Sequence, residues 1–153
     1  MSKWQKITLL ALRLALGWIF LYAGVTKILN PDWSAAGYLK GSQTLPFLYD
    51  WFANPQNIGW VNLLNEWGQT LVGLSLVLGV FIRPAAVGGI LLMILYYLPI
   101  LHFPYAGKGT TSFLVDQHVI FILVFILLII FDAEKYWGLK SVVKKYLPDR
   151  WKI

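Results

Sequence analysis

Residues 7–28 read ITLLALRLALGWIFLYAGVTKI, a nearly continuous apolar run interrupted by two cations. A helix that crosses a bilayer core needs about 20 mainly apolar residues, so this stretch predicts a membrane-spanning helix. Lys3 and Lys6 precede the run, as in a secretion signal. The run is longer than the roughly 7–15 apolar residues of such a signal, and no convincing cleavage site follows. We therefore expect a retained first span.

Three further apolar stretches, at 61–82, 84–101 and 114–131, predict three more spans. The short connection around Arg83 predicts a tight antiparallel hairpin between the second and third spans. The expected fold class is therefore all-α: one integral membrane four-helix bundle that occupies residues 1–153 as a single domain.

The composition narrows the class of protein. The chain is 58% hydrophobic and 13% charged, against roughly 25% charged residues in soluble domains. The expected partner of so much apolar surface is the lipid bilayer. The net charge is +6, but we expect no nucleic-acid binding because no soluble basic domain carries that charge. The absence of cysteine excludes disulfides, thiol catalysis and cysteine-ligated iron–sulfur clusters.

The distribution of cations predicts the orientation, since cytoplasmic loops carry an excess of Lys and Arg. If the N-terminus lies in the cytoplasm, three cations lie outside: Lys27, Lys40 and Lys108. The same orientation gives a larger inner set: Lys3, Lys6, Arg83, Lys135, Lys140, Lys144, Lys145, Arg150 and Lys152. We therefore expect a multi-pass plasma-membrane protein with both termini in the cytoplasm.

Two segments outside the spans have compositions of their own. The outer loop, residues 29–60, is rich in aromatic residues, so we expect two short interfacial helices near 32–40 and 46–53. The inner tail, residues 133–153, predicts a basic amphipathic helix on the anionic membrane surface.

A polar stripe interrupts the second span. Its members follow the spacing of one helical face: Asn62, Asn65, Glu66, Gln69 and Gly73. The stripe has two interpretations, interhelical hydrogen bonding or the wall of a small-molecule site. Glu66 favours the second, because hydrogen bonding between helices does not require a carboxylate.

The fourth span begins with Asp116 and His118. Asp116 either stabilises the helix dipole from the first turn or takes part in a site. His118 lies roughly 160° around the helical wheel from Asp116 and could point inward. His102 closes the third span on the same side, and two histidines there could clamp a haem. We nevertheless expect no haem, because two lone histidines are more often ordinary polar residues. We expect no metal either, because two further ligands of the right kind are not evident.

This topology brings ionisable groups together at the outer end of the bundle, beneath the aromatic loop. We predict acid–base catalysis by Glu66, Asp116 and His118. We predict substrate binding by Arg13, Lys27, Asn65, Gln69 and His102. Arg13 lies about 20 Å below Lys27 along the helix axis. The alternative to substrate binding is that Arg13 pairs with Asp132 at the inner end of the fourth span.

Three motifs now carry a family resemblance. The first span has the motif Arg13-x3-Gly17-x6-Gly24-x2-Lys27 within RLALGWIFLYAGVTKILNP. The second span has Glu66 followed by LVLGVFIRPAA, and the fourth begins Asp116-Gln117-His118. In these motifs the chain resembles the DoxX superfamily, most closely the DoxD-type small subunit of thiosulfate:quinone oxidoreductase.

The resemblance implies a four-helix membrane subunit that passes electrons from thiosulfate, or another small reductant, to membrane quinone as co-substrate. It also implies a second subunit, and a homo-oligomer is the other possible assembly. The alternative function is a non-enzymatic scaffold or accessory subunit of a redox complex, in which the polar stripe only holds helices together.

Overall fold

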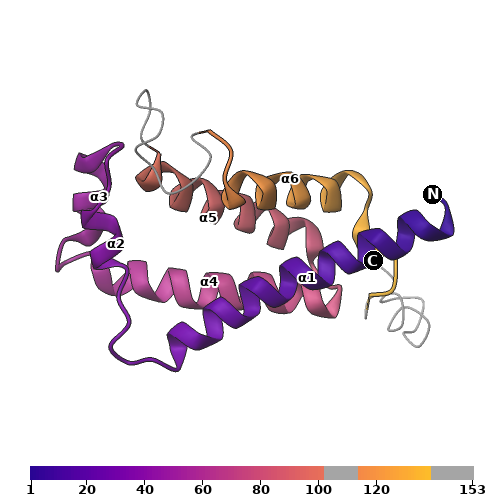
Figure 1. Ribbon diagram of the computed structural model, residues 1–153. Helices are drawn as coiled ribbons and strands as arrows, with labels where there is room; N and C mark the ends of the chain where they lie inside the picture. The colour runs from indigo at the N-terminus through magenta and orange to yellow at the C-terminus, as the bar shows by residue number, and fades with distance from the viewer. Residues whose placement is uncertain (102–113, 139–153) are drawn as a thin grey trace.

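The computed structural model describes residues 1–101 and 114–138, and every regular element in this part of the chain is a helix (Figure 1). The all-α class is therefore confirmed for the described residues. The long helices are α1 (Lys3–Ile28), α4 (Ile58–Leu78), α5 (Ile82–Ile100) and α6 (Gln117–Ile130). The short ones are α2 (Ala36–Lys40), α3 (Pro46–Ala53) and the 3₁₀ turn η1 (Ala133–Lys135).

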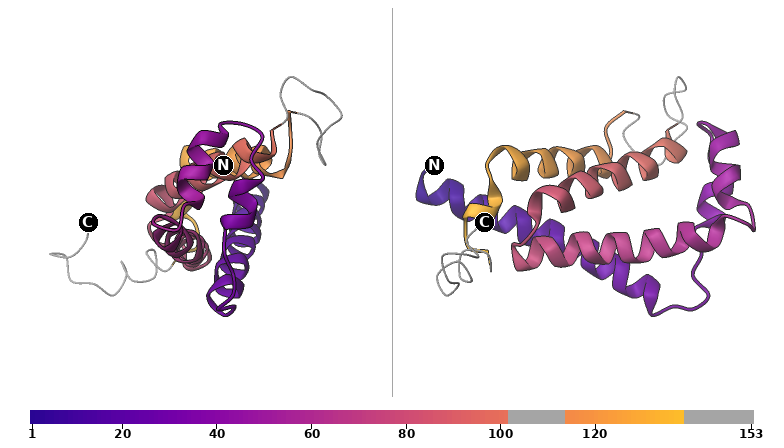
Figure 2. Two further views of the ribbon diagram at one scale, coloured as in Figure 1. Left: turned by 90° about the vertical axis from the view of Figure 1, so that its left-hand side faces the viewer. Right: turned by 180° about the vertical axis from the view of Figure 1, so that it is seen from behind.

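The long helices pack as antiparallel neighbours, α1 against α4, α4 against α5 and α5 against α6, with a smaller contact between α1 and α6. The short helices α2 and α3 lie across one end of this arrangement (Figure 2). We call that end the Lys27 end, because α1 finishes there. The opposite end carries the N-terminus and residues 131–138, and we call it the Arg13 end.

Glycines let α1 and α4 approach closely. A Cβ added to Gly73 would lie 2.2 Å from the backbone nitrogen of Leu21, and one added to Gly24 would lie 2.5 Å from the nitrogen of Thr70. Both distances are too short for any side chain, so these positions accept only glycine without a shift of the backbone. Small residues that permit such contact are typical of helix pairs in membranes.

Of the described helices, α1 and α5 are both long enough and apolar enough to cross a membrane. Helix α6 is also apolar but has 14 residues, which span about 21 Å. Helix α4 is long enough, but the polar stripe lowers its apolarity.

The helix ends differ from the expected boundaries for local reasons. Helix α1 begins at Lys3 rather than near residue 7, because Ser2 and Gln5 form a capping box. Helix α4 ends at Leu78 rather than 82, because Gly79 adopts a left-handed conformation with φ of 71°. Within the outer loop, α2 and α3 lie close to the two predicted short helices.

Two clusters of buried side chains hold the helices together. The larger joins the long helices and includes Phe20, Leu76 and Phe125, whose exposed fractions are 2% or less. The smaller lies under the outer loop and consists of Ala35, Leu39, Tyr49, Ala53 and Val61. The candidate site adjoins this second cluster.

Candidate functional site

A cavity of about 500 Å³ lies at the Lys27 end. Every long helix contributes to its wall, together with the outer loop and α2. Its lining residues are Lys27, Trp33, Ser34, Ala35, Tyr38, Leu39, Asn65, Gln69, Tyr96, Ile100, Asp116, Gln117 and His118. We call this hollow the Lys27 cavity. Its volume falls within the roughly 300–1,000 Å³ of small-molecule sites.

Lys27 projects from the last turn of α1 into the cavity wall. Its Nζ donates hydrogen bonds to Asn65 Oδ1 at 3.0 Å and to Gln69 Oε1 at 2.6 Å. The same Nζ lies 4.7 Å from the ring centroid of Trp33 and 5.7 Å from that of Tyr96. Neutral amides and aromatic faces therefore hold the ammonium, and no described carboxylate forms an ion pair with it. This arrangement leaves its positive charge available to an anionic or electron-rich ligand.

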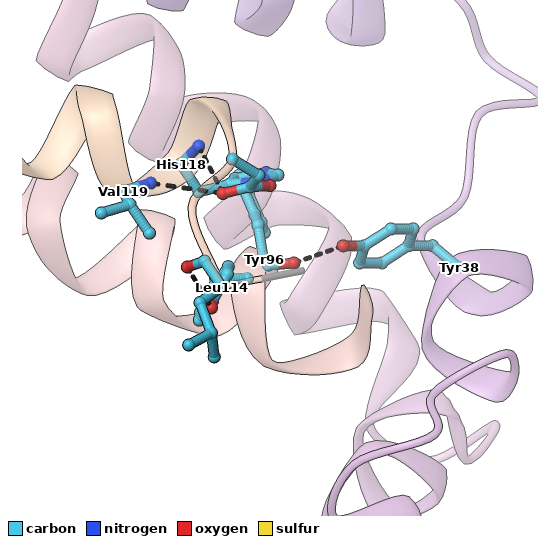
Figure 3. Close-up of polar contacts among 7 residues, drawn as sticks. Tyr38, Tyr96, Leu114, His118 and Val119 are labelled. Atoms are coloured by element: carbon cyan, nitrogen blue, oxygen red, sulfur yellow. Dashed lines mark hydrogen bonds and ion pairs between the residues drawn. The ribbon is translucent and has the colours of Figure 1, made fainter. Parts of the chain in front are cut away.

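Tyr96 connects the lysine to the rest of the wall. Its hydroxyl donates to Asn65 Oδ1 at 2.6 Å, so Asn65 accepts from both Tyr96 and Lys27. The Tyr38 hydroxyl donates to the backbone carbonyl of Tyr96 (Figure 3). Burial, with added effects from Tyr49 and Asp116, raises the pKa of Tyr38 to about 12. The Tyr38 phenol therefore stays protonated and remains a donor.

Asp116 and His118 form a dyad at the start of α6. Asp116 Oδ1 accepts from the backbone nitrogens of His118 at 2.9 Å and Val119 at 3.3 Å, which makes Asp116 the N-cap (Figure 3). Its other oxygen lies 2.5 Å from His118 Nδ1. The Asp116 side chain is 3% exposed and that of His118 is 13% exposed. A carboxylate on Nδ1 orients the imidazole, which suits the ring for proton transfer.

The helical-wheel angle expected for this pair was wrong, although Asp116 does cap the helix and His118 does line the cavity. Asp116 has extended backbone angles, φ −124° and ψ −173°, and is not a helical residue. The wheel angle therefore does not apply, and the two side chains meet instead of pointing apart. Capping and membership of the site, which the sequence left as alternatives for Asp116, are combined in one residue.

Glu66 does not line the Lys27 cavity. It lies one residue further along α4 than Asn65, where α1 packs, and its backbone carbonyl would lie 2.8 Å from a Cβ on Gly24. The side chain is half-buried. Its carboxylate attracts Lys27 electrostatically, but within the described residues it makes no ion pair.

Arg13 lies at the opposite end, away from the cavity. Its guanidinium donates to the backbone carbonyls of Ala133 at 3.3 Å, Tyr136 at 2.9 Å and Trp137 at 2.9 Å. The alternative contact with Asp132 is also wrong, because that carboxylate binds Arg83 and Lys135 instead. The structure thus separates Arg13 from the other predicted binding residues.

The structure brings together five of the predicted residues: Lys27, Asn65, Gln69, Asp116 and His118. His102 lies outside the described residues. Three aromatic residues of the wall, Trp33, Tyr38 and Tyr96, were not predicted as site residues. The signal for Tyr96 was a pair of phenols, Tyr96 and Tyr97, inside an otherwise apolar span. The aromatic loop contained Trp33 and Tyr38, but its sequence alone did not show which rings face inward.

Among the described residues, the helices and the site define an all-α protein with two helices that are long and apolar enough to cross a membrane, and with a polar cavity at one end. Comparison with family models gives a match to DoxX over residues 8–102. The chain belongs to the DoxX family, as its span-one and span-two motifs indicated. The matched region contains Lys27, Asn65, Gln69 and Tyr96. Searches of curated proteins and of solved structures found no significant match.

Proposed function

We propose that the four long helices cross the plasma membrane as a bundle, with the Arg13 end and both termini in the cytoplasm. Large apolar side chains are exposed along the long helices, among them Trp18, Leu71, Leu91 and Leu123. Soluble monomers seldom expose such extensive apolar surface. The described cations also support this orientation. Lys3, Lys6, Arg83 and Lys135 lie at the Arg13 end, whereas Lys27 and Lys40 lie at the other.

We further propose that the protein is a redox subunit that passes electrons from thiosulfate, or another small reductant, to membrane quinone. The observation that carries this proposal is the pairing, in one cavity, of an ammonium free of carboxylate contacts with a His–Asp dyad. Lys27 Nζ and a protonated His118 are donors suited to the two carbonyl oxygens of a quinone ring. Trp33 and Tyr96 offer flat aromatic faces to the same ring.

The overall reaction balances with quinone as the oxidant. Two thiosulfate ions form one S–S bond to give tetrathionate and release two electrons. The quinone takes up those electrons and two protons to become quinol. Since the donor is anionic and the product quinol has gained protons, the site must attract negative charge and deliver protons.

Three residues carry these tasks. Lys27 Nζ, held by Asn65 and Gln69, stabilises negative charge that develops on a quinone oxygen. His118 donates a proton, and Asp116 holds the imidazole through Nδ1 so that Nε2 remains for the substrate. A second protein subunit, or a second copy of this chain, is the proposed partner that supplies or receives the electrons.

A scaffold function is the second candidate, because the polar stripe also joins structural elements. Asn62 Oδ1 accepts from the backbone nitrogen of Ala35 at 3.0 Å, and its Nδ2 donates to Ser34 Oγ at 3.3 Å. These contacts hold the outer loop on α4 and require no substrate.

The test is quinone reduction by the purified protein in mild detergent, with thiosulfate, sulfite or sulfide as donor and a short-chain quinone as acceptor. Lys27→Met is compared with Lys40→Met, which removes an exposed lysine at the same end. We expect Lys27→Met to lower the rate at least tenfold and Lys40→Met to preserve it. Glu66→Gln, outside the cavity wall, should have a smaller effect than Lys27→Met. Absence of reduction with every donor, in a folded protein, would rule out catalysis by this subunit alone and leave either a missing partner subunit or the scaffold function.

A further inference from the structure

A second, apolar hollow adjoins the Lys27 cavity. It has a volume of about 50 Å³ and lies between α4 and α5, beneath α3. Three residues, Leu39, Asn65 and Tyr96, line both hollows. The rest of its lining is aliphatic or aromatic, including Tyr49, Phe52, Val61 and Leu92. We call this hollow the apolar recess.

The apolar recess leads to the outside of the protein. Two of its lining residues are largely exposed, Trp60 at 44% and Leu64 at 53%, whereas Val61 beside them is 7% exposed. The recess therefore has a closed inner wall and an open apolar rim. At the inner side the Tyr96–Asn65 hydrogen bond marks the junction with the Lys27 cavity.

The fold explains why a recess forms at this position. The short turn at Gly79 joins α4 to α5 at the Arg13 end, and the two helices diverge toward the Lys27 end (Figures 1 and 2). Helix α3 covers the region between α4 and α5 where the two helices diverge. Tyr49 attaches this cover to α5 through a hydrogen bond from its hydroxyl to the carbonyl of Leu95, at 3.0 Å.

Pro99 makes that carbonyl available. A helical carbonyl normally accepts from the nitrogen four residues later, but residue 99 is proline and has no N–H. The carbonyl of Leu95 therefore needs another donor, and the Tyr49 hydroxyl provides one. The cover over the recess is thus specified by a proline in α5 and a buried tyrosine in α3.

We propose that the apolar recess and its Trp60–Leu64 rim form the lateral entrance of the Lys27 cavity and hold the isoprenoid tail of the quinone. This inference rests on the proposed function and adds the lipid character of its substrate. The polar cavity suits a ring that carries hydrogen-bond acceptors, and the adjoining recess offers almost purely apolar contacts. A ligand that fits both has a polar head and an apolar tail. The rim lies on α4, which places the tail at the lipid-facing side of the bundle.

The variant Leu64→Trp tests this assignment, with Leu63→Trp as the matched control. Leu63 is 58% exposed and does not line the recess, so both variants add the same bulk to neighbouring exposed positions. Quinone reduction is measured in lipid nanodiscs with a long-tailed quinone and in detergent with a short-chain analogue. We expect Leu64→Trp to raise KM for the long-tailed quinone about tenfold and to leave that for the analogue unchanged. Equal KM values for the long-tailed quinone in the two variants would overturn the proposal.

A second measurement keeps the tail site separate from the redox reaction. A quinone with a photoreactive diazirine in its first isoprene unit is bound to the wild-type protein, illuminated and mapped by mass spectrometry. Labelling of the segment that contains Trp60 and Leu64, reduced in Leu64→Trp, supports the tail site even if no donor reduces quinone. In that event only the electron-transfer function fails. Labelling confined to other segments, or none, contradicts the lateral entrance.

Discussion

Arg13 and Lys27 lie on the same helix, α1, yet their hydrogen-bond partners at the two ends of the molecule differ in kind. Arg13 is 2% exposed and donates to three backbone carbonyls after α6. Lys27 donates to two side-chain amides and lines a cavity of about 500 Å³. At the Arg13 end the backbones touch, since a Cβ on Gly138 would lie 2.4 Å from the carbonyl oxygen of Gly79.

The comparison shows that the partners of a buried cation determine its role. A guanidinium has five donors in a plane and suits several carbonyls exposed where the chain reverses direction. The reversal occurs at Asp132 and Trp137, whose φ angles are 48° and 47°. An ammonium that donates to neutral amides has no carboxylate paired with it, so its charge can attract a ligand. One end is thus a structural clasp, and the other is the candidate site.

The largest expected effect is on stability, at Arg13. Arg13→Met leaves the carbonyls of Ala133, Tyr136 and Trp137 without their donor. A buried acceptor that loses its partner costs about 1–3 kcal/mol. Only the bond to Ala133 is fully buried, and those to Tyr136 and Trp137 are partly buried, so we expect a total loss of about 3 kcal/mol. Thermal unfolding in detergent measures it. An unchanged unfolding midpoint would show that the clasp contributes little.

The next effect is on the reaction, at the other end. We expect His118→Gln to lower kcat for quinone reduction about 100-fold, equivalent to about 2.7 kcal/mol, because the proton donor is lost. KM and the unfolding midpoint should change little. A fall in the midpoint without a change in kcat would instead give the contact between His118 and Asp116 a structural role alone.

Glycine substitutions compare the packing of the two ends directly. A Cβ on Gly79 would lie 2.5 Å from the Cα of Gly138, and Gly79 has φ of 71°. We expect Gly79→Ala to cost about 2 kcal/mol or more, since the left-handed conformation alone costs roughly 1–2 kcal/mol. A Cβ on Gly37 in α2 meets nothing within 4 Å. Gly37→Ala should therefore leave the unfolding midpoint unchanged or raise it slightly. Similar destabilisation by both variants would contradict the difference in packing.

The smallest effect concerns pH at the Arg13 end. Hydrogen bonds from Lys135 and Arg83 lower the pKa of Asp132 below its usual value. A lowered folded-state pKa stabilises the protein above the unfolded-state pKa, near 3.8. That contribution disappears as the pH falls through the folded-state value. Below about pH 4, the small difference between the unfolding midpoints of wild type and Asp132→Asn should therefore shrink. The exposed position of Asp132 keeps this change small. A difference between the two midpoints that stays constant down to pH 2 would contradict a stabilising role for the Asp132 carboxylate.

The sequence predicted the long helices and the short helices of the outer loop because apolar runs and aromatic clusters are local signals. It placed the end of α4 four residues late, since the apolar run continues past the left-handed Gly79. The glycine itself was the available signal, because helices commonly end at a left-handed glycine.

The candidate site was only partly predictable. The polar stripe correctly predicted that Asn65 and Gln69 share a face, but their contact with Lys27 depends on how α1 crosses α4. The clasp of Arg13 could not be predicted, because it joins residues more than 100 positions apart through a chain reversal without a clear sequence signal. Glu66 lies on the α1 side of the stripe, one residue from the cavity wall, and a stripe alone does not resolve such a difference.

The most direct test of the two roles compares Lys27→Met with Arg13→Lys in the same two measurements. Affinity for a short-chain quinone is measured by titration calorimetry, and stability by the thermal unfolding midpoint. The different roles predict that Lys27→Met loses at least tenfold in affinity and keeps its midpoint, whereas Arg13→Lys keeps its affinity and unfolds at a lower temperature. Wild-type quinone affinity in Lys27→Met would contradict the central claim that the Lys27 cavity is the binding site.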